Sequence, residues 1–177
     1  MPAYYIYLIS SLPMLLFGIK PPFSYERFLK MCEGLIREQA LYILRNLPIK
    51  DGDFNPCPYN STIQKWLAFD TSLRNELVKI RAQHKHTDPL KYLRKESRAD
   101  FLLSHIALAA HRNPSLVEGE NNLDEARWKV LDEIEAGHYF DNDYLLVYGY
   151  KLKLLERWKR INTADKADLL DKALRKD

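Results

Sequence analysis

The sequence predicts an all-α fold, a bundle of six to eight helices. Apolar residues recur along most of the 177-residue chain at spacings of three, four or seven, which places them on one face of a helix. Proline, glycine, asparagine and aspartate gather between these segments, where helices end and loops begin. No convincing ladder of alternating apolar and polar residues predicts a sheet, and no segment repeats at a fixed period.

The length suits a single helical domain over residues 1–177. An alternative division gives a small N-terminal lobe over 1–57 and a main helical body over 58–177. The boundary falls in residues 49–60 (IKDGDFNPCPYN), which form the clearest predicted loop. A hydrophobic content of 46% and a charged content of 29% are ordinary for a globular protein and argue against wholesale disorder.

The first apolar segment, residues 3–17, is expected to form a buried helix or strand. No lysine or arginine precedes it, Pro13 interrupts it, and it is shorter than the ~20 apolar residues of a membrane span. We therefore expect neither a signal peptide nor a transmembrane helix, and a cytoplasmic location. The two cysteines, Cys32 and Cys57, are expected to be free thiols.

Residues 24–47 carry one apolar face of a long helix. Ser24 is its expected N-cap, Pro48 closes it, and Pro21-Pro22 form an extended entry. The apolar positions are Phe28, Cys32, Leu35, Ile36, Ile43 and Leu47.

Three more helices are expected before residue 112. The first has an apolar stripe made of Trp66, Phe69, Leu73, Leu77 and Ile80. Asp88-Pro89 then opens a short helix as cap and first-turn proline. Residues 99–110 (ADFLLSHIALAA) are apolar nearly all round, which predicts a central buried helix.

The last third of the chain is also expected to be helical. Asn113-Pro114 starts a helix that runs toward Ala136, bends near Gly119 and stops at Gly137. Asp141 or Asn142 caps the next helix, whose basic last turns suit the negative end of its dipole. Thr163 is then expected to cap a short terminal helix.

The motifs that carry chemistry are missing from the sequence. It has no phosphate-binding glycine loop and no nucleophile elbow, so we expect no enzyme and no catalytic, cofactor or metal site. Glu135 and His138 have the Glu-x-x-His spacing of di-iron bundles, but such sites need two copies and one is present. A surface glutamate and a histidine beyond the helix end explain the pair better. An enzyme built on His105 or His138 is a remote third hypothesis.

Three other groups have a simpler structural explanation. His105 is expected to be a hydrogen-bonded core histidine of the buried helix. His84 and His86, near Asp88, are expected to be solvated because a structural zinc site closes four ligands. The run from Asp141 to Asp143 resembles the start of a calcium loop but lacks its glycine, so a helix cap explains it.

Charge is segregated along the chain. Residues 79–98 contain seven lysines and arginines against two acids, and residues 118–143 contain nine acids against two bases. Alternating solvated faces would explain this, and so would a pair of complementary docking surfaces. The candidate partner-binding residues are Lys79, Arg81, Lys91, Arg94, Lys95, Asp124, Glu125, Asp132 and Glu133.

Two segments carry a resemblance to known proteins. The opening YYIYLISSLPMLLFGIKPPFSYERFLKMC resembles the start of an uncharacterised bacterial family encoded beside subunits of V-type (V/A-type) ATPases. The later block resembles the same family and, more loosely, the helical repeats of the V-type ATPase C subunit, which is called d in eukaryotes. The similar positions are Leu123-Asp124, Arg127-Trp128, Leu131-Asp132, Phe140-Asp141, Tyr150-Lys151-Leu152-Lys153 and Glu156-Arg157-Trp158.

The resemblance implies a C-subunit-like helical fold and a non-catalytic role. The chain would be a subunit or accessory of a bacterial V-type ATPase, a connector of the central stalk that contacts the shaft or the membrane ring. It would have no cofactor, and it would reach the inner membrane only through its partners. A C subunit is about twice as long, so this chain would supply part of such a funnel. The alternative function is a module that binds nucleic acid or an anionic surface through residues 79–98, although Tyr92 is the one aromatic residue there.

Overall fold

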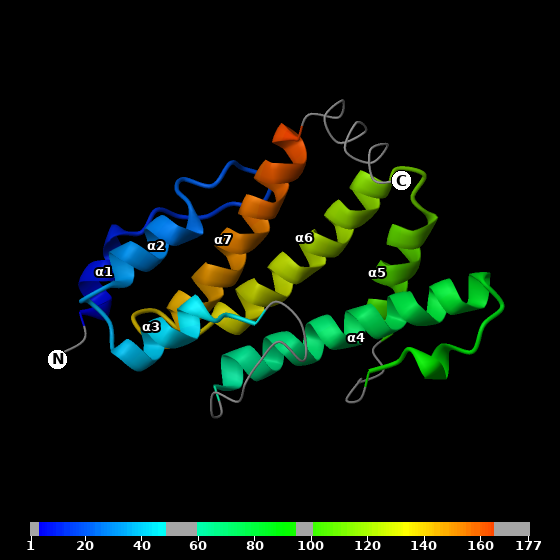
Figure 1. The fold of residues 1–177 in the computed structure, drawn as a ribbon, viewed down its shortest axis with the longest axis horizontal. Helices are drawn as coiled ribbons and strands as arrows, with labels where there is room; N and C mark the ends of the chain where they lie inside the picture. The colour runs from blue at the N-terminus through cyan, green and yellow to red at the C-terminus, as the bar shows by residue number, and fades with distance from the viewer. Residues whose placement is uncertain (1–3, 49–59, 95–100, 165–177) are drawn as a thin grey trace, which may run out of the picture.

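The computed structural model describes residues 4–48, 60–94 and 101–164, and within them it contains seven α-helices, one 3₁₀ helix and no strand (Figure 1). The predicted all-α multi-helix bundle is confirmed. The helices are α1 (Tyr5–Ser11), α2 (Tyr25–Cys32), α3 (Glu38–Arg45), α4 (Ser61–His84), η1 (Pro89–Lys91), α5 (Phe101–Arg112), α6 (Leu116–Glu135) and α7 (Asn142–Thr163).

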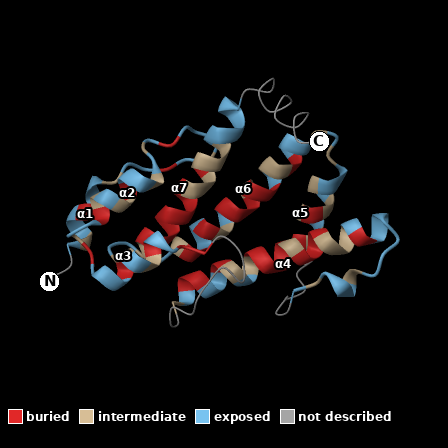
Figure 2. Ribbon diagram, in the orientation of Figure 1, coloured by how far each residue is buried: buried red, intermediate tan, exposed pale blue. Residues whose placement is uncertain are grey.

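Three long helices form the body of the molecule. α6 and α7 pack on each other, and α4 contacts both of them (Figure 1). α5 packs on α4 and α6, whereas α2 and α3 pack on α7. α7 therefore lies between the N-terminal helices and α6, and buried residues line it along much of its length (Figure 2).

The buried apolar residues form two clusters of unequal size. The larger cluster joins side chains of α1, α2 and α3 to α7, α6 and the start of α4, with Phe28, Leu44 and Leu146 completely buried. The smaller cluster lies between α4, α5 and α6 and consists of Leu73, Leu77, Leu103, Ala107 and Leu123. The predicted boundary between residues 57 and 58 lies outside the described residues.

The predicted long helix over residues 24–47 is wrong, because the chain breaks into α2 and α3. Gly34 has a φ of +75°, in the left-handed region that favours glycine, and it ends the first helix with a turn. Apolar residues on both sides of the break, Phe28 and Leu44 among them, still belong to the larger cluster. The helical spacing thus continues across the turn, although the helix does not.

The predicted central position of the helix near residues 99–110 is also wrong. α5 packs on α4 and α6, and Leu103 and Ala107 are buried on that side. Leu102 is 65% exposed, and His105 is exposed rather than a core histidine. Apolar side chains therefore extend around more of α5 than the part that its neighbours cover.

Most predicted helix ends are confirmed by side-chain caps. Ser24, Asp88 and Asp141 each accept a hydrogen bond from a backbone N–H in the first turn of the helix that follows. α6 begins later than expected, because Ser115 caps it and Asn113 Oδ1 instead accepts from the Ser115 N–H at 2.9 Å.

Two glycines, one within α6 and one just after its C-cap, have distinct roles. Gly137, just after the C-cap, has a φ of +93° and ends the helix as predicted. At Gly119, α5 lies very close to the backbone of α6, since an added Cβ would lie 2.7 Å from the Ala110 carbonyl oxygen. The helix that Thr163 was expected to cap lies outside the described residues, as does Cys57.

Candidate interaction surfaces

A buried network of ion pairs joins α4, α6 and α7. Arg127 of α6 donates from Nε to Asp70 of α4 at 2.9 Å and from Nη1 to Asp124 at 2.7 Å. Asp124 also accepts from Arg157 Nη1 at 2.6 Å and from Trp158 Nε1 at 2.9 Å, both on α7. Burial opposes ionisation of Arg127, but the two carboxylates outweigh it and raise the pKa of the guanidinium.

Asp124 was expected on an acidic docking surface, and that prediction is wrong. The carboxylate is completely buried and all of its described partners are intramolecular. A buried carboxylate is stable only when several donors compensate its lost hydration, which is the arrangement here. Asp124 therefore holds helices together.

The other three acidic candidates lie at the surface of α6. Glu125 pairs with Lys129 at 2.7 Å, and both side chains are largely exposed. Asp132 is exposed and pairs with the buried Lys151 of α7 at 2.6 Å. Glu133 is exposed. Asp132 and Glu133 are thus available to a partner at the C-terminal end of α6.

The basic candidates lie along the C-terminal half of α4 and on the segment that packs beside it. Lys79 is partly exposed and pairs with Glu76 of its own helix at 2.6 Å. Lys95 lies outside the described residues. We name the remaining exposed cations of this region the basic end: Arg81, Lys85, Lys91 and Arg94.

The basic end has a fixed backbone. The buried side chain of Asn75 on α4 accepts from the Arg94 N–H and donates to the Arg94 carbonyl oxygen, each at 3.0 Å. These two bonds hold the segment after η1 against α4. The C-terminus of α5 also lies here, since the rings of His84 and His111 are 5.8 Å apart. Its exposed Arg112 adds a cation that the sequence pattern did not associate with this region.

The acidic and basic candidates lie far apart in the molecule. The C-terminal end of α4 is at one end of the long axis, whereas α6 ends toward the other (Figure 1). A partner bound at one of these surfaces would therefore not reach the other.

An exposed apolar surface on α1 was missed by the sequence analysis. Its members are large and at least half exposed, and they border one shallow hollow with Tyr5 and Ser10. We name this surface the N-terminal patch: Tyr4, Ile6, Tyr7 and Phe140. The signal was present in the tyrosine-rich start, but the apolar run was interpreted as core alone.

The N-terminal patch lies on a well-anchored helix. Leu8 and Ile9, on the opposite side of α1, are buried in the larger cluster. The Tyr4 N–H donates to the Leu35 carbonyl oxygen at 2.7 Å. A partner would meet the patch already in place, which lowers the entropic cost of binding.

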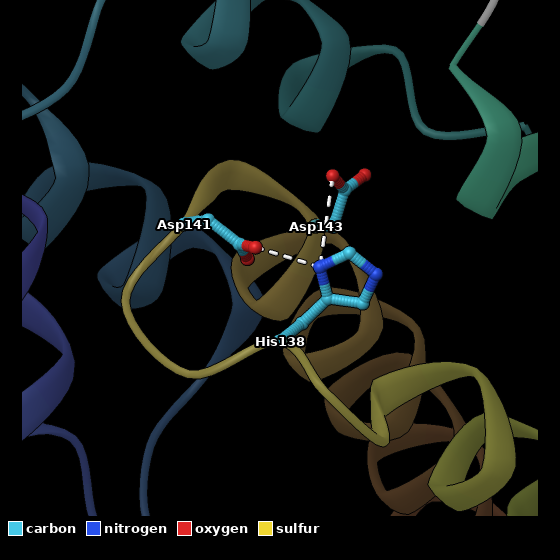
Figure 3. A group of neighbouring side chains, drawn as sticks. All are labelled: His138, Asp141 and Asp143. Atoms are coloured by element: carbon cyan, nitrogen blue, oxygen red, sulfur yellow. Dashed lines mark hydrogen bonds and ion pairs between the residues drawn. The ribbon is translucent and has the colours of Figure 1, made fainter.

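His138, Asp141 and Asp143 meet at the start of α7 (Figure 3). His138 Nδ1 lies 2.6 Å from Asp141 Oδ2, and Asp141 Oδ1 accepts from the Tyr144 N–H at 2.9 Å. Asp143 accepts from Asn60, the N-cap of α4, at 2.7 Å. These bonds cap α7 and tie it to α4, which agrees with the expected cap.

Glu135 and His138 do not act together. Glu135 contacts the ammonium of Lys151, and His138 contacts Asp141. Lys151, which also pairs with Asp132, is the point where these acids of α6 meet α7.

Comparison with known proteins gives no relative: no family model, no curated protein and no solved structure matches the chain. Among the described residues, the helices are each too short or too polar to cross a bilayer.

Proposed function

We propose that the chain is a non-catalytic subunit or accessory protein of a bacterial V-type ATPase, a C-subunit-like connector of the central stalk. The observation that carries the proposal is the N-terminal patch. Three of its four residues, Tyr4, Ile6 and Tyr7, belong to the opening segment, residues 4–32, which carries part of the resemblance to the ATPase-associated family.

The chemistry of the N-terminal patch suits a protein partner. Ile6 and Tyr7 are 66% and 70% exposed. Contiguous exposed apolar side chains mark interaction sites, and tyrosine is enriched among the residues that contribute most to binding. Tyrosine also combines a large apolar ring with a hydroxyl that stays hydrated until the partner arrives.

The charged surfaces support a connector that touches more than one partner. The basic end would guide one acidic partner, and Asp132 with Glu133 would guide a basic one. The later block of residues that resembles the family supports the fold rather than a contact surface. Asp124, Arg127 and Arg157 hold α6 to α4 and α7, so the likeness there is one of helix packing.

A pull-down from the native host tests this proposal. The chain carries a C-terminal tag, the complex is washed at moderate salt, and the captured proteins are identified by mass spectrometry. We expect V-type shaft or ring subunits, and we expect their loss with the double substitution Ile6→Ser and Tyr7→Ser. Leu116→Ser is the matched control, because Leu116 is 86% exposed on α6.

Two results would contradict the proposal. One is the capture of no ATPase subunit by the unaltered chain. The other is equal capture by the double variant, which would exclude the N-terminal patch as the docking surface.

Deletion of the gene should also impair ATP-driven ion pumping in membrane vesicles.

The basic end favours a second candidate, a module that binds nucleic acid or an anionic surface. Within the described part of the chain, no ion pair engages Arg81 or Arg94. This function predicts binding of a fluorescein-labelled single-stranded RNA that weakens steeply as salt rises. Arg81→Gln with Arg94→Gln should weaken that binding, whereas Lys79→Gln should change it little because Glu76 already neutralises Lys79. Tight binding to shaft subunits without RNA affinity would remove this candidate.

A further inference from the structure

One imidazole and two carboxylates converge on the segment that joins α6 to α7 (Figure 3). His138 lies just after α6, Asp141 is the N-cap of α7, and Asp143 lies in the first turn of α7. His138 Nδ1 is 2.6 Å from Asp141 Oδ2 and 3.9 Å from Asp143 Oδ2. Ligand nitrogen and oxygen atoms lie about 2.0–2.2 Å from a zinc ion, so atoms this close together reach a common ion with small movements of their side chains.

The other oxygen of each carboxylate is held by a group outside this cluster. Asp141 Oδ1 accepts from the Tyr144 N–H at 2.9 Å, and Asp143 Oδ1 accepts from the side-chain amide of Asn60 on the far side of the chain, the N-cap of α4, at 2.7 Å. The capping bonds therefore use Oδ1 of each aspartate and leave Oδ2 directed at His138. Contacts of this kind orient the ligands of metal sites and raise the affinity for the ion.

The charge of the cluster favours a cation. Among the described residues, no lysine or arginine forms an ion pair with Asp141 or Asp143. The side chains of His138, Asp141 and Asp143 are 29%, 43% and 25% exposed. An ion would therefore enter from solvent and keep water at the positions that the protein does not fill.

The donor atoms distinguish between classes of cation. Calcium and magnesium take oxygen ligands, whereas an imidazole nitrogen suits zinc, nickel, copper and iron. Three protein ligands with water in the fourth position form a zinc site that is open to solvent.

We propose that His138, Asp141 and Asp143 bind one divalent transition-metal ion, Zn²⁺, through His138 Nδ1 and the Oδ2 atoms of the two aspartates. The predicted helix cap is kept, because it uses the other carboxylate oxygens. The proposal is independent of the ATPase assignment.

Titration with zinc chloride tests the site, followed both by calorimetry and by nuclear magnetic resonance of the histidine rings. The full chain is purified with a tag that lacks histidine and is freed of metal by a chelator. It has five histidines, and His138→Gln identifies the signals of His138. We expect one Zn²⁺ per chain and a saturable shift of those signals. Magnesium and calcium should bind at least about tenfold more weakly.

Conservative variants separate the ligands from the groups that position them. Asp141→Asn and Asp143→Asn keep an oxygen for the capping bonds, and each should weaken zinc binding about tenfold or more. Asn60→Ser keeps a capping side chain but loses the amide that orients Asp143, so it should weaken binding about tenfold. Glu133→Gln, at an exposed acid of α6, is the matched control and should change nothing. Circular dichroism with the chelator present shows whether each variant is folded.

A pair of histidines elsewhere in the molecule provides the competing site. The rings of His84 and His111 lie 5.8 Å apart, and the double variant His84→Gln with His111→Gln should bind zinc as the unaltered chain does. Loss of binding in that variant would overturn the proposal. So would the absence of saturable zinc binding, undiminished affinity in His138→Gln and Asp143→Asn, or an affinity for calcium equal to that for zinc.

Discussion

The Asp124 carboxylate accepts three hydrogen bonds inside the protein, from Arg127, Arg157 and Trp158. Asp124→Asn keeps the shape of the side chain but removes the charge that compensates two guanidinium groups. Breaking a buried pair costs about 3 kcal/mol or more, so the free energy of unfolding should fall by that amount. Urea unfolding followed by circular dichroism measures it.

The adjacent residue provides the matched control. Glu125 pairs with Lys129 at the exposed surface of the same helix. Exposed pairs contribute roughly 0–1 kcal/mol, so Glu125→Gln should change the free energy of unfolding by less than about 1 kcal/mol. Equal losses in the two variants would mean that the Asp124 network contributes no more than a surface pair.

Asp141 makes the stability of the protein dependent on pH. Partial burial would raise the pKa of its carboxyl, but the hydrogen bonds from His138 and the Tyr144 N–H outweigh this and lower the pKa below 3.8. A lowered folded-state pKa gives a contribution that is full above the unfolded pKa and is lost as pH falls through the folded pKa. Its window therefore lies below about pH 4.

Asp141→Asn tests this dependence, because asparagine is also a good N-cap. The variant should be less stable than the unaltered protein at pH 6, and the difference should shrink as pH is lowered from about 4 toward the folded-state pKa. Urea unfolding at a series of pH values measures the difference. A difference that stays constant down to pH 2.5 would show that the charge of Asp141 is not responsible.

At the scale of elements, two helical glycines should respond oppositely to alanine. A Cβ at Gly119 would lie 2.7 Å from the backbone oxygen of Ala110, so α5 and α6 must separate. Such overpacking costs about 1–3 kcal/mol. A Cβ at Gly149 meets the side chains of Leu47 and Tyr25 at 3.4 Å, an ordinary contact.

Gly149→Ala should therefore leave the free energy of unfolding unchanged or raise it by up to about 1 kcal/mol, because alanine is the better helix former. Gly119→Ala should lower it. Thermal melting of both variants beside the unaltered protein gives the comparison. A stabilising Gly119→Ala would mean that α5 yields freely, and that its contact with α6 is loose.

Helix existence and capping could be predicted from the sequence, because they depend on local chemistry. Ser24, Asp88 and Asp141 cap helices through bonds to residues two or three positions away. The break at Gly34 was missed because apolar spacing continues across a short turn. The exposure of α5 was missed because composition shows which faces are apolar, and tertiary packing decides which of them are covered.

At the scale of the whole molecule, the charged surfaces were only partly predictable. Runs of like charge are visible in the sequence, and Arg81, Lys91 and Asp132 are indeed exposed. The burial of Asp124 depends on partners on another helix, up to 34 positions away. The N-terminal patch likewise requires side chains from separate elements, and local patterns do not reveal which segments meet.

The two core clusters predict that the molecule does not open uniformly. α7 is buried from Leu145 to Leu152, mostly in the larger cluster, whereas Leu103 and Ala107 are the α5 residues of described burial that lie buried in the smaller one. Local opening requires less free energy where fewer apolar contacts are lost. Amides of α5 should therefore exchange with solvent through openings of lower free energy than those of α7.

Native-state hydrogen exchange across low urea concentrations measures both. We expect the central amides of α7 to report the global free energy of unfolding, with its full dependence on urea. Those of α5 should show a smaller free energy and a weaker dependence. The central amides of α6, which contacts both helices, are the internal reference. If α5 and α7 reported the same free energy with the same dependence on urea, the two clusters would unfold as one unit. The smaller cluster would then be coupled to α7 as strongly as the larger cluster is.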